Sequence, residues 1–496
     1  MKKTLIALAM FLLPVLSFAQ DDAVVYPDFA QKIKDIQSFR LNDNINIVAI
    51  NADYETFDVM AIDENLNTVW HTSINGYAMA IAKFKGKIIA IAATDYSAMK
   101  GGQSNTYNAT LLDPKTGDKV VEKTIFQGSP DYVIFPQILI DKDEFYGLGT
   151  RQSSFARGMH VAAPGLFALF SASRYQKEYR QTQDMNFIQF DEKLNEVNRL
   201  KPFFDPNGIC LDWAINSKGD VFIGWLIDNY INIYRYENGK GQPKIAKLDI
   251  SIPDGFFDRS PNLSFAVSES NRNLINCAFF FLDDDNKSTL WVGNVDVATG
   301  KKNNITETFN SDHRKNLEKA FAKPNKKINS PDLGSLKTLD VRGFQEVNGT
   351  LMLAVASTTT QASMVSSYTS YLVENTIVIN AYDASLGLKF QQLFPSKGIS
   401  IAKRLPFSFY VQNNKLIVTA ADISGMNNIN ALYGVLDLGS GQWDKMYRLS
   451  KKKIDGKAYP NGPAALWFNN SFYLPYMNPK GLTGSKFDVL MQQNTY

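Results

Sequence analysis

The chain alternates between short apolar runs and short polar turns along most of its length, and many runs have the two-residue period of β-strands. One stretch shows the pattern well: apolar residues run from Thr110 up to Asp113, a turn follows through Pro114 and Gly117, and an alternating run leads away to Thr124. Proline fixes φ and glycine permits positive φ, so the chain reverses direction here. The stretch predicts a β-hairpin.

This hairpin recurs along the chain. Seven copies carry an acidic residue at the turn, at Asp63, Asp113, Asp191, Glu237, Asp296, Asp383 and Asp437. A second hairpin type precedes each copy and occurs eight times, within residues 39–48, 81–90, 138–145, 213–222, 265–279, 344–351, 410–417 and 466–473. After the eighth, only one further strand-like segment follows, at residues 486–491. The mismatch predicts that the fourth strand of the last unit comes from residues 23–26.

Four strands per unit, repeated and closed by joining the two ends, describe a β-propeller. We therefore predict an all-β fold: a single propeller of four-stranded antiparallel blades over residues 20–496, with eight blades, or seven if one weak unit is not a blade. The N-terminal strand is expected to join the C-terminal blade. Closure of this kind removes the edge strands that invite aggregation.

Three turns carry a more specific pattern, Asp-x-x-Thr/Ser-Gly. They are Asp113-x-x-Thr116-Gly117, Asp296-x-x-Thr299-Gly300 and Asp437-x-x-Ser440-Gly441. This pattern resembles the turn of quinoprotein-like repeats, in the β-propeller superfamily that also holds WD-repeat-like proteins. That family has a Trp four residues after the Gly, where this chain has Val121, Asn304 and Lys445. The resemblance implies the fold and carries over no quinone cofactor or dehydrogenase activity, so no cofactor is predicted.

Residues 1–19 have the pattern of a secretory signal peptide. A basic lead at Lys2 and Lys3 precedes an apolar run from Leu5 to Leu16, and small residues at Ser17 and Ala19 suit a signal peptidase. Elsewhere no run reaches the roughly 18 to 20 apolar residues that a membrane-spanning helix needs. We expect an exported protein without a transmembrane segment, in the periplasm or at the outer membrane or cell surface of a Gram-negative-type bacterium.

Connections in an antiparallel meander alternate between the two rims of the ring. The tight turns then share one rim, here called the plain rim, and the longer connections lie on the other, the elaborated rim. Three insertions are expected there, at residues 151–184, 310–334 and 357–375. The second predicts a short surface helix with Ser311 as N-cap and Pro324 as a stop, and the third a long hairpin or loop.

The first insertion holds an apolar group formed by Leu166, Phe167, Leu169 and Phe170. Two interpretations are open. The loop folds back and buries these side chains on the propeller, or it exposes them as a patch for a protein partner or the edge of a membrane.

Charge is unevenly distributed over the expected elaborated rim. The whole chain has 52 Lys and Arg against 49 Asp and Glu, yet the segments 310–334, 396–404 and 450–457 each carry an excess of three basic residues. Their basic arc comprises Arg314, Lys315, Lys326, Lys327, Lys397, Lys403, Arg404, Lys451, Lys452 and Lys453. These side chains are either solvated loop residues or a docking surface for an acidic protein, an anionic glycan or a lipid head group.

Motifs for catalysis and metal binding are missing from the sequence. The three histidines, His71, His160 and His313, have no metal-ligand spacing, and no nucleophile elbow or phosphate-binding loop occurs. Cys210 and Cys277 lie in apolar runs, which favours buried free thiols over a disulfide. No metal site, catalytic residue or nucleic-acid partner is predicted.

Two functions from different classes remain. The first is a secreted non-catalytic scaffold, an accessory subunit that binds a protein partner in the cell envelope. The alternative is a carbohydrate-binding or glycan-processing propeller that uses its central funnel, where carboxylates from distant blades would meet.

Overall fold

A computed structural model describes residues 25–96, 104–156, 182–206, 208–227, 230–249, 264–282, 288–324, 327–333, 339–362, 370–399, 407–423, 428–449, 454–480 and 486–495. The predicted signal peptide lies outside these residues, as do Leu166, Phe167, Leu169 and Phe170.

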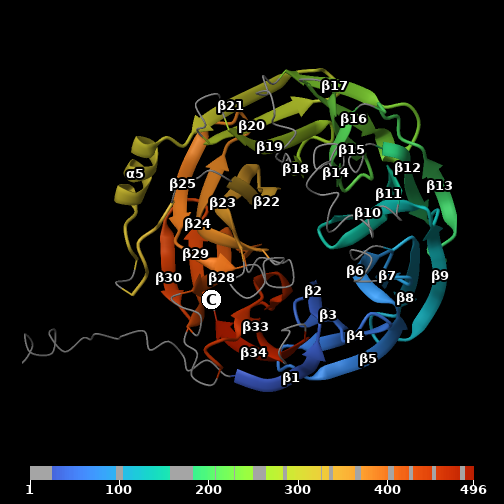
Figure 1. Cartoon of the computed structure of the whole chain (residues 1–496), viewed down its shortest axis with the longest axis horizontal. Helices are drawn as coiled ribbons and strands as arrows, with labels where there is room; N and C mark the ends of the chain where they lie inside the picture. The colour runs from blue at the N-terminus through green and yellow to red at the C-terminus, as the bar shows by residue number, and fades with distance from the viewer. Residues whose placement is uncertain are drawn as a thin grey trace, which may run out of the picture.

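The described strands form eight antiparallel four-stranded units around a common axis (Figure 1). Blade 1 comprises β2 (Asp35–Asn42), β3 (Ile45–Asn51), β4 (Thr56–Asp63) and β5 (Thr68–Asn75), and blade 2 comprises β6 (Tyr77–Phe84), β7 (Lys87–Ala93), β8 (Thr106–Leu112) and β9 (Lys119–Gln127). Blade 3 comprises β10 (Tyr132–Asp141), β11 (Glu144–Ala156), β12 (Thr182–Phe190) and β13 (Glu196–Leu200). Blade 4 comprises β14 (Ile209–Ile215), β15 (Val221–Ile227), β16 (Tyr230–Tyr236) and β17 (Lys244–Asp249).

Blades 5 to 7 continue in the same order. Blade 5 comprises β18 (Ser264–Val267), β19 (Leu274–Leu282), β20 (Ser288–Asp296) and β21 (Lys302–Thr308). Blade 6 comprises β22 (Leu339–Val347), β23 (Thr350–Ala362), β24 (Ser370–Tyr382) and β25 (Leu388–Phe394). Blade 7 comprises β27 (Ser408–Gln412), β28 (Lys415–Ile423), β29 (Ile429–Asp437) and β30 (Trp443–Arg448). The first strand of each blade lies nearest the axis and the last lies outside (Figure 1).

Blade 8 joins the two ends of the chain. Its inner positions are taken by β31 (Tyr459–Pro460) and β32 (Leu466–Trp467), followed by β33 (Ser471–Lys480) and β34 (Lys486–Thr495). The outermost strand is β1 (Val25–Ile33), which pairs antiparallel with β34 in a register that sets Val25 opposite Gln492 and Ile33 opposite Phe487. The predicted eight-bladed propeller, closed by the N-terminal strand, is therefore confirmed.

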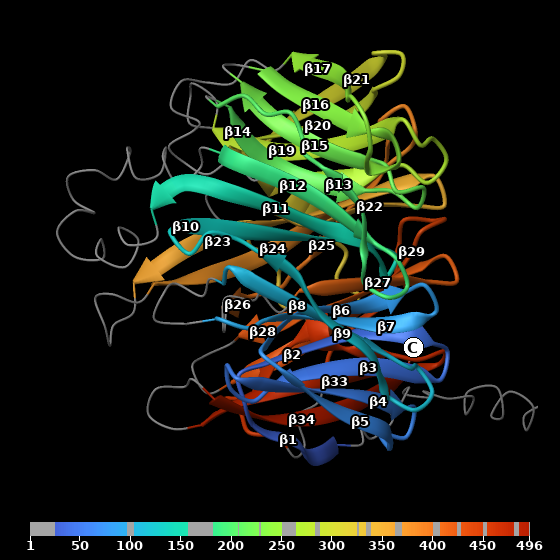
Figure 2. The same ribbon diagram turned by 90° about the vertical axis from the view of Figure 1, so that its right-hand side faces the viewer.

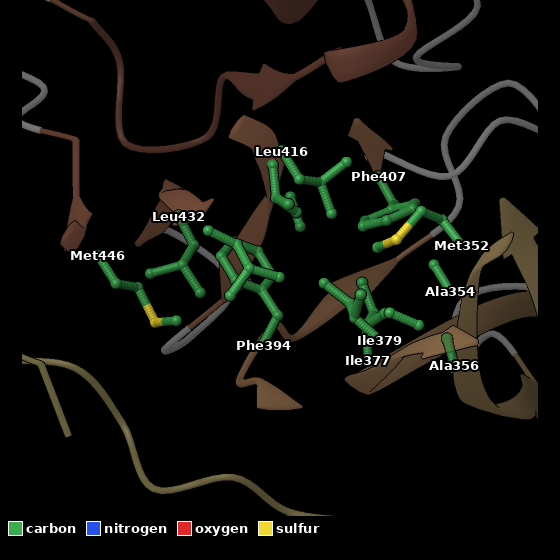
Figure 3. Packing of buried hydrophobic residues seen from close by; sticks show 14 of the residues in the cluster. Met352, Ala354, Ala356, Ile377, Ile379, Phe394, Phe407, Leu416, Leu432 and Met446 are labelled. Atoms are coloured by element: carbon green, nitrogen blue, oxygen red, sulfur yellow. The ribbon is translucent and has the colours of Figure 1, made fainter. Parts of the chain in front are cut away.

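Hydrophobic packing holds neighbouring blades together. Inner strands such as β3 and β20 are buried on both faces, so their side chains fill the space on either side of the blade. One large cluster of buried apolar residues lies at each of the eight blade interfaces. Figure 3 shows the interface where Phe394 and Met352 of blade 6 meet Leu416 and Met446 of blade 7.

The two rims differ as predicted. All seven acidic turns and all eight inner hairpins fall between paired strands at the plain rim, while β11 and the hairpin of β23 and β24 project from the opposite rim (Figure 2). Each aspartate at a turn fixes the loop after it: the Oδ1 atom of Asp113 accepts hydrogen bonds from the N–H groups of Lys115 and Thr116. These bonds lower the pKa of the Asp113 carboxyl, because they stabilise its charged form.

The turns also join one blade to the next. The indole Nε1 of Trp70, on the outer strand of blade 1, donates to the carbonyl oxygen of Pro114 in the turn of blade 2 at 3.0 Å, and Thr72 Oγ1 donates to the carbonyl of Gly117 at 2.6 Å. Phe390 and Gln392 repeat this contact on Gly441, between blades 6 and 7. The three motif turns have no Trp four residues after their glycine. The tryptophan that docks on the blade 2 turn, Trp70, instead follows the turn at Asp63 in blade 1.

We expect a Gly117→Ala substitution to destabilise the protein more than Gly300→Ala does. Both glycines end the same turn motif and have nearly equal positive φ, 76° and 72°, so the backbone strain is matched. A Cβ at Gly117 would lie 2.5 Å from the Trp70 ring, whereas a Cβ at Gly300 would meet nothing within 4 Å. The extra cost of overpacking is about 1–3 kcal/mol.

Urea denaturation of both variants measures this difference. Equal shifts of the two midpoints would contradict the docking role of Trp70.

Candidate functional site

The second insertion forms an ordered connection between blades 5 and 6. After β21 the chain enters helix α5 (Ser311–Ala320), which confirms the predicted surface helix (Figure 1). Its N-cap is Asn310, not Ser311: the Asn310 side chain accepts hydrogen bonds from the N–H groups of Asp312 and His313. The helix ends at Ala320, four residues before Pro324.

Buried anchors fix this insertion to the blades. Phe309 and Leu333 pack in the cluster between blades 5 and 6, and Ile328 packs between blades 6 and 7. Polar contacts add to them, since Leu333 N donates to Glu318 Oε1 at 3.0 Å and Asp332 N donates to Thr376 Oγ1 at 2.8 Å. The described part of the insertion is therefore anchored to blade 6 and its neighbours.

The third insertion extends blade 6 beyond the rim. Strands β23 and β24 stay paired as far as Ala362 opposite Ser370, so of the two predicted forms, hairpin or loop, the described residues form a paired hairpin stem. A short strand, β26 (Gly398–Ile399), pairs with the start of β24 and sets Gly398 opposite Glu374. We call the described residues of 309–333, this hairpin and β26 the blade-6 platform.

A cluster of charged side chains lies at the inner edge of the platform. Arg342 comes from the innermost strand β22, and its Nε lies 2.8 Å from Glu374 Oε2 while its Nη2 lies 3.2 Å from Asp340 Oδ2. Glu374 is fully buried, and Arg342 and Asp340 are each 15% exposed. Burial raises the pKa of the Glu374 carboxyl to about 7, against the opposing effect of the Arg342 guanidinium.

This geometry restricts the chemistry of the cluster. A carboxyl with a pKa near 7 suits proton transfer, but Glu374 exposes no surface that a substrate could contact. Its contact with Arg342 holds the guanidinium toward Asp340 on the inner strand. The cluster therefore presents a fixed charged pair at the elaborated rim, with Glu374 as its buried support.

Another carboxyl with a raised pKa, the half-buried Asp212, lies on the inner strand of blade 4. Asp212 accepts hydrogen bonds from Trp213 N at 2.8 Å and from Phe265 N of blade 5 at 3.1 Å, so it joins two inner strands. Burial raises its pKa to about 6. Cys210 and Cys277 are both free thiols, and burial raises the pKa of Cys210 to about 11, which makes it a poor nucleophile.

Four residues of the predicted basic arc lie among the described residues, and the segments that carry two of them meet at Asp422. Arg314 and Lys315 lie on α5. Lys397 pairs with blade 7, where its backbone N–H donates to Ala421 O at 3.0 Å. Lys327 precedes Asn329, whose side chain donates to Asp422 Oδ1 at 2.9 Å, and Asp422 is the bridge partner of Lys397. Lys326, Lys403, Arg404, Lys451, Lys452 and Lys453 lie outside the described residues.

No sequence motif pointed to the carboxyls of Glu374 and Asp212. Glu374 sits in an expected insertion without any motif, and Arg342 is 32 residues away from it along the chain. Among the described residues, no group of three or more His, Cys, Asp or Glu side chains is arranged to hold a metal ion. The described part of the chain also has no helix with the length and apolar character to cross a membrane.

Comparisons with known proteins agree with the fold and go no further. No protein-family model and no curated protein matches the chain. The solved structures similar to it include the WD40 domain of SCAP from fission yeast, with 10% identity over 95% of this chain and 98% of that one, at a TM-score of 0.39.

A europium-containing methanol dehydrogenase matches with 10% identity over 95% of this chain and 92% of its own, at a TM-score of 0.41. The polysaccharide lyase Uly1 matches with 10% identity over 94% and 99%, at a TM-score of 0.36. The resemblance to WD-repeat and quinoprotein propellers holds at the level of fold, which the strand pairing of this chain establishes directly.

We expect the stability of the Glu374→Gln variant, measured relative to the parent protein, to increase as pH rises. The folded pKa of Glu374 is about 7 against a reference value of 4.5, so the folded state keeps a proton that the unfolded state has lost between these values. The parent therefore loses stability as pH rises through this window, by up to about 1.4 kcal/mol per pH unit. Glutamine cannot ionise, so the variant avoids this loss.

Denaturation midpoints of both proteins from pH 4.5 to 8 test the expectation. Asp212→Asn serves as a comparison, because its pKa of about 6 places the same trend in a lower window, near pH 4 to 6. A difference between parent and Glu374→Gln that does not change with pH would contradict the assignment.

Proposed function

We propose that this protein is an exported, non-catalytic scaffold that binds a protein partner of the cell envelope through its elaborated rim. The blade-6 platform is the observation that carries the proposal. Its connecting segments are fixed by buried anchors such as Phe309, Ile328 and Leu333, so they present a preformed surface. Binding to a preformed surface avoids the entropic cost of ordering loops.

The distribution of contacts supports the choice of rim. Plain-rim turns are engaged in blade-to-blade contacts such as those of Trp70 and Phe390. The elaborated rim carries the longer connections, and loops on a rigid scaffold are where binding residues concentrate. Export is supported by the signal-peptide pattern of residues 1–19.

The charge of the platform indicates the chemistry of the partner. Lys315, Lys327 and Lys397 are exposed and come from three separate positions on or beside the platform. Such a surface favours an acidic protein face, mainly by steering association.

Reversing these three charges is expected to weaken partner binding about tenfold or more, with a loss that is greatest at low salt. The variant carries Lys315→Glu, Lys327→Glu and Lys397→Glu. Its matched control carries Lys115→Glu, Lys193→Glu and Lys301→Glu, which are exposed lysines at plain-rim turns and give the same change of net charge.

Affinity capture from detergent-solubilised envelopes, followed by binding measurements with the captured protein, provides the readout. The proposal requires one protein that copurifies with the parent and the plain-rim control and is depleted with the platform variant. Equal recovery with both variants, or recovery of the parent only as a free monomer, would refute it.

A further inference from the structure

A separate feature of the elaborated rim lies at blades 1 and 2, away from the platform on blades 5 to 7 (Figure 1). Three partly exposed tyrosines converge there. Tyr54 follows β3, Tyr77 begins β6 and Tyr96 follows β7. The rings of Tyr77 and Tyr96 stack with centroids 4.3 Å apart, and the Tyr54 ring lies 5.4 Å from Tyr96 and 5.7 Å from Tyr77.

Backbone contacts hold the three rings in place. Asp53 Oδ1 accepts hydrogen bonds from the N–H groups of Glu55 and Thr56, which fixes the turn that carries Tyr54. The side chain of Asn51, fully buried, accepts a hydrogen bond from Ala78 N at 2.9 Å and so ties the end of β3 to the residue after Tyr77.

The close approach of Tyr77 and Tyr96 depends on a glycine. Gly76 has a φ of 104°, and a Cβ at this position would lie 2.9 Å from the carbonyl oxygen of Ala93. Tyr77 pairs with Ala93 in the sheet, so the ring of Tyr77 reaches the segment that bears Tyr96. Asp95 fixes that segment by accepting a hydrogen bond from Asn105 N at 3.0 Å.

Charged groups of both signs surround the rings. The Nζ atom of Lys34 lies 3.1 Å from the centroid of the Tyr54 ring. The pKa of Lys34 is lowered by its partial burial and by the nearby charge of Lys486, while Asp53 opposes this. Asp35, which is 7% exposed, contributes to raising the pKa of Tyr96, after burial and Tyr54. Donors and acceptors therefore lie within a short distance of one aromatic surface.

We propose that Tyr54, Tyr77 and Tyr96 form a subsite for a neutral sugar residue of an oligosaccharide. Aromatic rings pack against the C–H faces of a pyranose, while a lysine, a carboxylate and the tyrosine hydroxyls suit the donors and acceptors of its hydroxyl groups. The near balance of charge, with Lys34 and Lys486 against Asp35 and Asp53, favours a neutral sugar over an acidic one.

The surroundings of the cluster distinguish it from a protein-binding patch. The large hydrophobic side chains that the described chain leaves exposed are Val69, Val120, Ile140, Val197, Phe203, Tyr230, Ile245 and Leu388. None belongs to the segments that form the tyrosine cluster. A protein interface would be expected to have an apolar centre larger than three rings, whereas a single sugar residue matches this area.

A panel of neutral hexasaccharides, comprising cellohexaose, maltohexaose, xylohexaose, mannohexaose and chitohexaose, tests the proposal by calorimetric titration of the full chain. At least one is expected to bind, and Tyr54→Ala is expected to weaken that binding about tenfold or more. Tyr54 is the best position for substitution, because its turn is fixed by Asp53 and its ring belongs to none of the blade-interface clusters.

The matched control is Tyr230→Ala. Tyr230, on blade 4, is 40% exposed and also has a lysine over its ring, with Lys247 Nζ 3.0 Å from the centroid, but no second ring from the described residues is stacked on it. This variant should bind within twofold of the parent. Three results would each overturn the proposal: no panel member binds at millimolar concentration, Tyr54→Ala binds as the parent does, or only acidic oligosaccharides bind. Melting curves confirm that both variants are folded.

Discussion

Pairing between the two ends of the chain is the constraint on which the ring depends. Strand β34 would be an exposed edge without β1, and its N–H and C=O groups would invite pairing with another chain. With β1 in place, Ile33 joins Met491 and Ile36 in the cluster between blades 8 and 1. Each blade then has two neighbours, so every apolar blade face is covered by another.

Closure also explains why the two rims have different roles. The plain-rim turns that end at Gly117 and Gly441 lie against the outer strand of the preceding blade, and the glycines permit this contact. Trp70 and Thr72 donate hydrogen bonds to the carbonyl groups of Pro114 and Gly117, and the Trp70 ring also packs on the turn. The opposite rim has no such requirement, and there the chain accommodates the blade-6 platform on one arc and the tyrosine cluster on another.

Local signals in the sequence predicted most of the fold. The acidic residue of each turn accepts hydrogen bonds from N–H groups only a few residues further along the chain. The hairpins at Asp113 and Asp296 can therefore be recognised without knowledge of their surroundings. The same locality caused two errors. Asn310 and Ser311 are both good N-cap residues, and only the backbone conformation decides between them.

The docked tryptophan was missed for a related reason. The turn at Asp63 closes on Asn67, one residue earlier than the turn at Asp113, which closes on Asp118. The Asp63 turn has no motif glycine, so counting four residues onward from such a glycine does not find Trp70. Trp70 nevertheless lies on the outer strand of its blade, where the family places its tryptophan.

The sequence by itself determined the repeat, the closing strand and the rim that carries the longer connections, and it favoured eight blades over seven, because periodicity and turn chemistry are properties of neighbouring residues. Only the tertiary structure decided which distant residues meet. Arg342 of strand one contacts Glu374 of strand three across the strand that lies between them in blade 6. Tyr54, Tyr77 and Tyr96 converge because two blades pack side by side. Contacts of this kind depend on the packing angle and register of the blades, which no local pattern encodes.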